Sequence, residues 1–206
     1  MKTINKFFAL LFVMAMAQYG LAQTIVGSAH DFSGDTWNPS GEVCIVCHTP
    51  HNANTTVTDA PLWNHEVTTA TFTPYSSATL DAAVGQPDAS SKLCLSCHDG
   101  TVALDNFGGT TGGTNFIGGN DLLGTDLSND HPISFTYDPA LASADGGLFD
   151  PSTQNSGLGG VINDDMLIGG KMECASCHDV HNGSGIGFLL VKSNANSALC
   201  LTCHNK

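Results

Sequence analysis

All eight cysteines of the chain lie in four copies of one pentapeptide, Cys-x-x-Cys-His, at residues 44–48, 94–98, 174–178 and 200–204. Two thiols at this spacing can each form a thioether with a haem vinyl group, and the histidine that follows then ligates the iron. The motifs therefore predict four covalently attached c-type haems. The thioether residues are Cys44, Cys47, Cys94, Cys97, Cys174, Cys177, Cys200 and Cys203, and the proximal iron ligands are His48, His98, His178 and His204.

Two other kinds of site use paired cysteines. Four Cys-x-x-Cys pairs can build two zinc sites with four thiolates each. They can also form four disulfides between neighbouring cysteines in an exported protein. Neither alternative explains why a histidine follows every second cysteine. The pattern therefore favours a tetrahaem cytochrome c.

The first residues have the features of a secretory signal. Lys2 and Lys6 precede an apolar run at 7–17, and small residues follow at the expected cleavage position. We predict that residues 1–22 are removed and that 23–206 form one tetrahaem cytochrome domain. The apolar run is too short to cross a bilayer, so we expect no membrane span in the mature chain. Export indicates a secreted, extracellular or cell-surface protein, with the periplasm as the alternative.

The charge balance excludes two classes of partner. The chain has six lysines, no arginine and nineteen acidic residues, which gives a net charge of −13. Binding to nucleic acid or to anionic lipid requires cationic contacts with phosphate, so we expect neither. The partners that fit are redox proteins or extracellular electron acceptors.

The segment 23–206 provides too few residues per haem for a conventional hydrophobic core. No long amphipathic pattern is present, and glycine-rich stretches at 107–124 and 151–170 indicate loops. Short helices are predicted at 90–97 and 193–204, the latter opened by Asn194 or Asn196. The expected fold class is mostly irregular coil with a few short α-helices wrapped around four stacked c-type haems.

Five histidines lie outside the motifs and are candidates for the distal face of the irons: His30, His51, His65, His131 and His181. Methionine is the usual competitor, but only Met166 and Met172 follow the predicted signal. The count therefore favours histidine on both faces of each iron, with one histidine to spare. Iron ligated in this way has no open position, so we predict electron transfer and no enzymatic activity.

His51 and His181 stand three places after the proximal ligands His48 and His178. A residue so close to a proximal ligand cannot reach the far face of the same iron, but it can ligate a neighbouring haem. His30 lies near the predicted mature N-terminus, so we interpret it as the surplus histidine or as a ligand donated to another subunit.

Several segments resemble the doubled-CxxCH multihaem cytochromes. They are Cys47-His48-Thr49-Pro50-His51-Asn52, Leu62-Trp63-Asn64-His65, Cys97-His98-Asp99-Gly100-Thr101, Asp130-His131-Pro132-Ile133 and Cys177-His178-Asp179-Val180-His181-Asn182. The likeness is greatest to filament-forming tetrahaem extracellular cytochromes of the OmcE type. The resemblance implies four bis-histidine haems, little regular structure, and a homopolymer in which an adjacent subunit supplies one axial histidine.

Three functions follow from these observations. The leading hypothesis is an exported protein that passes electrons from haem to haem and polymerises into extracellular conductive filaments. A monomeric periplasmic electron shuttle uses the same haems. An electron-transfer subunit of a reductase is the third possibility.

Overall fold

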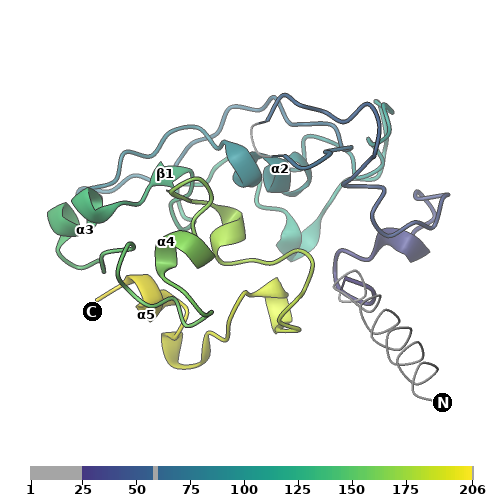
Figure 1. The fold of residues 1–206 in the computed structure, drawn as a ribbon. Helices are drawn as coiled ribbons and strands as arrows, with labels where there is room; N and C mark the ends of the chain where they lie inside the picture. Colours follow the sequence, from purple (N-terminus) through teal and green to yellow (C-terminus); the bar gives the residue numbers. More distant parts are fainter. Residues whose placement is uncertain (1–24, 58–59, 206) are drawn as a thin grey trace, which may run out of the picture.

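The computed structural model describes residues 25–57 and 60–205, so the predicted signal at 1–22 lies outside it. The described chain is mostly coil (Figure 1). Its α-helices are α2 (Ala89–His98), α3 (Pro139–Asp145), α4 (Ile162–Asp165) and α5 (Cys200–Cys203). Single 3-10 turns are η1 (Phe32–Gly34), η2 (Gly119–Asp121), η3 (Cys174–Ser176), η4 (Gly187–Leu189) and η5 (Ala195–Ser197). The prediction of coil with a few short helices is confirmed. No helix in the described part is long and apolar enough to cross a membrane.

One small sheet connects distant parts of the chain. Strand β1 (Phe135–Thr136) pairs antiparallel with β2 (Lys171–Met172), so that Phe135 lies opposite Met172. The strand β2 leads directly into η3 and the third motif, and η3 packs against α2. The sheet therefore holds the third motif beside the second, although eighty positions separate them in the sequence.

The helix predicted at 90–97 is confirmed as α2, which is one residue longer at each end. Asp88 occupies the position before its first turn, but its side chain does not bond to the helix N–H groups. Its carboxylate instead forms an ion pair with Lys171 on β2. The residue type that usually caps a helix is thus used here to bind another segment.

The continuous helix predicted at 193–204 is wrong. The segment divides into η5 and α5, because Asn196 and Ser197 have φ values of 55° and 63°, outside the right-handed helical region. Asn194 accepts a hydrogen bond from Leu199 N–H at 3.2 Å, which closes the turn between the two pieces. The loop predicted at 151–170 also contains the short helix α4.

Helix α3 was not predicted, although its sequence carries three boundary signals. Asp138 accepts a hydrogen bond from the Leu141 N–H at 2.8 Å. Pro139 occupies the first turn, where no N–H is needed, and Gly146 ends the helix with a φ of 67°. The helix was overlooked because its seven residues are too few for a 3.6-residue apolar repeat to be recognised.

Two groups of buried side chains form the core. The larger surrounds the fourth motif and contains Phe135, Tyr137, Ala142, Ile162, Met166, Leu167, Met172, Leu199 and Cys203. The smaller contains Phe72, Leu95 and Leu127, on the buried side of α2. Tyr137 donates from its hydroxyl to the Phe149 carbonyl at 2.6 Å, which satisfies its one buried polar atom. The larger core thus holds the fourth motif, with Cys177 of the third packed against it, and the smaller core holds the second motif through Leu95.

We predict that Asp138→Ala destabilises the protein by about 1 kcal/mol, because the helix loses its side-chain cap. Chemical denaturation of the haem-loaded protein, followed by far-ultraviolet circular dichroism, measures the change. The exposed mid-helix variant Ser143→Ala is the matched control and should lie close to the parent. Equal effects of the two substitutions would show that the cap contributes nothing.

Candidate functional site

Each Cys-x-x-Cys-His motif forms one helical turn. The His48 N–H donates to the Cys44 carbonyl at 2.8 Å, and the third and fourth motifs repeat this bond at 3.1 and 3.0 Å. The second motif lies within the last turns of α2. One turn places both cysteines and the histidine of a motif on neighbouring parts of the same helical surface. This is the arrangement in which one haem can be bound by three side chains of one motif.

The proximal rings of the first three motifs are oriented by backbone carbonyls. Nδ1 of His48 lies 2.8 Å from the Pro61 oxygen. Nδ1 of His98 lies 2.7 Å from the Asp121 oxygen, and Nδ1 of His178 lies 2.9 Å from the Phe188 oxygen. A carbonyl can only accept, so each Nδ1 carries the proton and each Nε2 has a lone pair. A metal-ligating histidine is usually fixed by a bond of this kind at its other nitrogen.

The carbonyl acceptors were not predicted from the sequence. In each case a later segment of the chain returns to the motif and pairs with its backbone. Thr49 N–H donates to the Leu62 carbonyl at 2.8 Å, and Asp179 N–H donates to the Leu189 carbonyl at 2.6 Å. The fourth motif pairs with an earlier segment, through Phe149 N–H and the Cys203 carbonyl at 2.9 Å. Because these contacts use main-chain atoms, no residue pattern marks them in advance.

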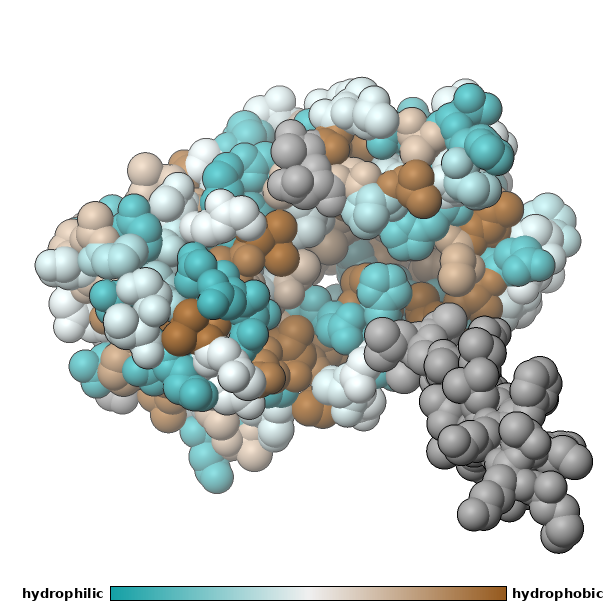
Figure 2. Space-filling model, viewed as in Figure 1, coloured by the Kyte–Doolittle hydropathy of each residue, from teal (hydrophilic) through white to brown (hydrophobic). Residues whose placement is uncertain are grey.

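The returning segments also carry exposed apolar side chains. Leu62, Leu122 and Phe188 lie beside the carbonyls that orient the three proximal rings, and Phe188 is 91% exposed. Figure 2 shows brown hydrophobic side chains on the visible face, some beside hollows in the surface. Large apolar side chains gathered at the attachment motifs suit the apolar faces of a porphyrin.

Three proximal rings have a second histidine ring opposite them. The ring centroids of His98 and His30 are 6.1 Å apart, and those of His48 and His181 are also 6.1 Å apart. The centroids of His204 and His131 are 6.3 Å apart. Each pair joins one motif histidine with one histidine that the sequence analysis proposed as a distal ligand.

These separations fit two axial ligands of one iron. A metal–imidazole nitrogen bond is about 2.0 Å long, which puts the centroids of two rings on opposite faces of one metal about 6 Å apart. His30 has a further feature of such a site, since its buried Nδ1 has no hydrogen-bond partner among the described residues. Burial, and then the neighbouring His98, lower the pKa of His30 to about 4, so the ring is neutral at pH 7, as iron ligation requires.

The interpretation of His30 as surplus, or as a ligand for another subunit, does not agree with this placement. The ring lies opposite His98 of the same chain and also packs against Phe32, with centroids 5.8 Å apart. The sequence analysis judged His30 by its position near the N-terminus. The turn at Phe32–Gly34 returns that segment to the molecule, because Asp31 accepts the Ser33 N–H and closes it.

Both ring nitrogens of His65 lie near backbone carbonyls. Nδ1 lies 2.8 Å from the Glu66 oxygen and Nε2 lies 3.1 Å from the Ala103 oxygen. The residue is only 1% exposed. A neutral imidazole carries one N–H, so it donates to one of the two carbonyls and keeps a lone pair on its other nitrogen. Nε2 also lies 3.7 Å from the Cys97 sulfur, which places His65 beside the second motif.

One proximal ligand, His178, and one distal candidate, His51, remain to be described. His178 has its Nδ1 on a carbonyl like the other proximal ligands, whereas the His51 side chain is exposed. The described residues contain no ring contact between His51 and another histidine. The two doubled motifs nevertheless share one backbone turn, because Asn52 and Asn182 have φ values of 57° and 55°. Asparagine tolerates this left-handed conformation better than most residues.

The two alternative uses of the cysteines find no support in the described part of the chain. All eight cysteines are free. No group of three or more cysteine, histidine or acidic side chains there is arranged to hold a metal ion. Met166 and Met172, the competing axial residues, are packed in the larger core cluster.

The motifs lie close to one another. The thiols of Cys94 and Cys174 interact, and this contact together with burial raises the pKa of Cys94 well above its usual value. Burial raises the pKa of Cys97 to about 12, with a further contribution from Cys47. Burial and then Cys200 raise the pKa of Cys177. The second motif is thus near the first and the third, and the third is near the fourth.

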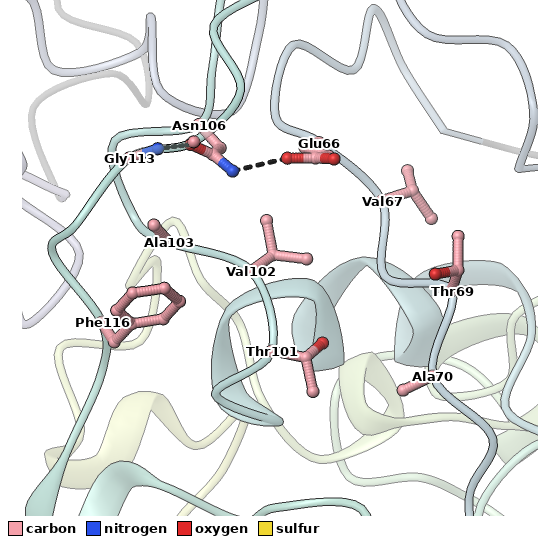
Figure 3. Close-up of a pocket in the computed structure, with 11 residues that line it drawn as sticks. Glu66, Val67, Thr69, Ala70, Thr101, Val102, Ala103, Asn106, Gly113 and Phe116 are labelled. Carbon is pink, nitrogen blue, oxygen red and sulfur yellow. Dashed lines mark hydrogen bonds between the residues drawn. The ribbon is translucent and has the colours of Figure 1, made fainter.

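A separate open pocket lies between the segment after His65 and the glycine-rich loop (Figure 3). Asn106 joins its walls, because its Nδ2 donates to Glu66 at 2.5 Å and its Oδ1 accepts from Gly113 N–H at 2.7 Å. The lining contains no cysteine or histidine. This pocket is therefore not one of the attachment sites, and the loop at 107–124 is fixed by protein contacts.

We predict that His30→Ala in the haem-loaded protein converts one haem per chain to the high-spin state, because His98 loses its opposite ring. His65→Gln is the matched control and should leave every haem low-spin, since none of the three pairs of motif and distal rings includes His65. Electron paramagnetic resonance of the oxidised protein measures the high-spin fraction. A new high-spin signal in His65→Gln, with none in His30→Ala, would reverse the assignment of the two residues.

Comparison with known proteins adds one finding. A family model described as the doubled CXXCH motif matches residues 168–206, which contain the third and fourth motifs. No curated protein matches the chain. The match indicates covalently bound c-type haem. Together with the motif geometry, it supports a multihaem c-type cytochrome.

Proposed function

We propose that the chain is an exported tetrahaem cytochrome that carries electrons between redox partners and assembles into extracellular filaments. The observation that carries the tetrahaem assignment is the placement of a second histidine ring about 6 Å from three of the four motif histidines. One iron between the members of each ring pair would account for its spacing. The fourth motif histidine, His178, has the same carbonyl-bound Nδ1 as the others.

Haem bound at the four motifs supplies reversible one-electron chemistry between ferric and ferrous iron. The protein contributes the axial rings, fixes their orientation and holds the motifs at short separations. The interaction between the Cys94 and Cys174 thiols, and the electrostatic effects of Cys47 on Cys97 and of Cys200 on Cys177, support a continuous series of neighbouring sites. An electron carrier that is ligated on both faces has no position for a substrate, which supports transfer rather than catalysis.

Two features support the assembly proposal. His178 presents a ring without an opposite histidine among the described residues, and His51 is exposed on a doubled motif. We propose that His51 completes the iron site of His178 in a neighbouring copy of the chain. An axial bond between copies would link subunits at each junction and bring their terminal haems together. If His51 instead reaches His178 of its own chain, the protein is a monomeric shuttle.

The proposed location is outside the cell or at its surface, with redox proteins or extracellular acceptors as partners. The net charge of −13 suits basic redox partners and does not suit nucleic acid.

We predict four haems per chain in the mature protein, one for each motif. A pyridine haemochrome assay, divided by the protein concentration from amino-acid analysis, measures the ratio. Replacing both cysteines of the second motif, Cys94→Ala with Cys97→Ala, should reduce the ratio by one. A wild-type ratio near two would disprove the tetrahaem proposal.

We predict that the native protein forms filaments in negative-stain electron microscopy and that His51→Ala yields monomers with one high-spin haem per chain. The loss of one axial bond per junction accounts for both effects. His131→Ala is the control, because its ring lies opposite His204 of the same chain. It should create a high-spin haem and leave the filaments intact. A monomeric wild-type protein at high concentration would favour the shuttle.

A further inference from the structure

A carboxyl group is buried where the second and third motifs meet. Glu173 immediately precedes Cys174 and is only 1% exposed. Its Oε2 accepts hydrogen bonds from the Ser134 hydroxyl at 2.9 Å and from the Ser91 hydroxyl. The Ser91 oxygen in turn accepts the Cys174 N–H at 2.9 Å. Glu173 thus connects the first turn of α2, which leads to Cys94, with the turn that carries Cys174.

A second carboxyl group faces it. The Asp88 side chain lies at hydrogen-bonding separation from Glu173, and both this contact and the charge of Asp88 raise the Glu173 pKa. One oxygen of Asp88, Oδ2, is paired with Lys171. The other, Oδ1, and Oε1 of Glu173 are both buried and have no hydrogen-bond partner among the described residues.

Two buried carboxylate oxygens without donors are costly. One proton satisfies both of them, because a protonated Glu173 Oε1 can donate to Asp88 Oδ1. Asp88 is suited to deliver this proton, since its side chain is 49% exposed and so contacts solvent. The pair therefore has the arrangement of a buried proton site with a single connection to water.

The other titratable groups around Glu173 are few. Lys171 lies on β2 and is held by Asp88. The third motif contributes Cys174, and α2 contributes Cys94, whose thiols do not titrate once they are thioethers. Burial is the largest cause of the raised pKa of Glu173, and the bonds from Ser91 and Ser134 oppose it. Neither carboxyl group lies within two residues of a histidine assigned to iron.

We propose that Glu173, together with Asp88, is a proton-binding site that couples proton uptake to electron uptake at the second and third haems. This inference rests on the proposed tetrahaem function. Glu173 is joined through Ser91 to the motif of one haem and through the chain itself to the motif of the other. A negative charge added at either site favours the neutral form of this carboxyl group.

The reaction balances with one electron and one proton. A one-electron donor supplies an electron, which reduces one of the two ferric haems. The Glu173 carboxylate takes one proton from water through Asp88 and forms an O–H bond, which donates to Asp88 Oδ1. When an acceptor removes the electron, the O–H bond breaks and the proton returns to water. Charge in this buried region therefore changes little over one cycle of transfer.

The sign of the pH effect follows from this scheme. Burial is the main cause that raises the pKa of Glu173 above its usual value. Reduction of either neighbouring haem would raise this pKa further, because the added negative charge disfavours the carboxylate. Between these two values the midpoint potential falls as pH rises, by at most about 59 mV for each tenfold change in proton activity. Below the lower pKa and above the higher pKa, Glu173 makes no pH-dependent contribution to the midpoint potential.

The test is a spectroelectrochemical titration of the haem-loaded protein across the pH range, with parent and variants compared. Glu173→Gln should remove the pH-dependent step assigned to these haems. Asp88→Asn should move the step to lower pH, because the repelling charge is lost and the new amide can donate to the carboxylate. Glu42→Gln is the matched control, since Glu42 is exposed and lies two residues before the first motif. It should match the parent.

An independent readout is redox-difference infrared spectroscopy. Reduction of the parent should produce the C=O band of a protonated carboxyl group, and this band should be absent in Glu173→Gln. If Glu173→Gln does not mature with its haems, the shift in Asp88→Asn decides the matter. If the pH-dependent step in midpoint potential persists unchanged in both variants, the proposed proton site is wrong. The proposal of electron transfer would still stand. A parent without haem would instead overturn the proposed function.

Discussion

The hydrogen bond from a ring Nδ1 to a backbone carbonyl determines much of this structure. It appears at His48, His98 and His178, each time with a carbonyl from a segment ten to twenty-three positions away. It fixes the tautomer, aims Nε2 away from the backbone, and draws a later stretch of coil onto the motif. A chain with little helix or sheet thus gains defined tertiary contacts at the places where its chemistry occurs.

The sequence predicts the covalent attachment sites more completely than it predicts the pairs of axial histidines. Eight cysteines and four motif histidines were assigned from spacing alone, because the attachment chemistry permits only that spacing. The distal histidines were identified as a group, but their partners were not, since pairing depends on how the coil folds. His30 was judged by its position near the N-terminus, whereas the turn closed by Asp31 places its ring 6.1 Å from that of His98 in the same chain. His65 differs from the others in lying beside two carbonyls and the Cys97 sulfur, which no local pattern indicates.

The secondary structure was likewise predicted from the sequence in some segments and not in others. Helix α2 was predicted because attachment motifs usually begin or interrupt short helices and residues 88–91 offer a cap, and the structure contains it. The end of the chain has a similar composition, but two left-handed residues, Asn196 and Ser197, divide it. Such a break results from the need to bring the fourth motif against Leu148 and Tyr137, a tertiary requirement without a local signal. The carboxyl pair was hidden for the same reason, because Asp88 and Glu173 meet only when the third motif packs on α2.

The exposed side chains beside the motifs have a consequence for biogenesis. Leu62, Leu122 and Phe188 are all exposed large apolar side chains in the protein alone. A chain that lacks the haem of one motif would therefore keep an exposed apolar surface at that motif. Surfaces of this kind promote aggregation and proteolysis. A haem bound at each motif would cover these side chains. Their exposure would then distinguish an incomplete chain from a fully loaded one.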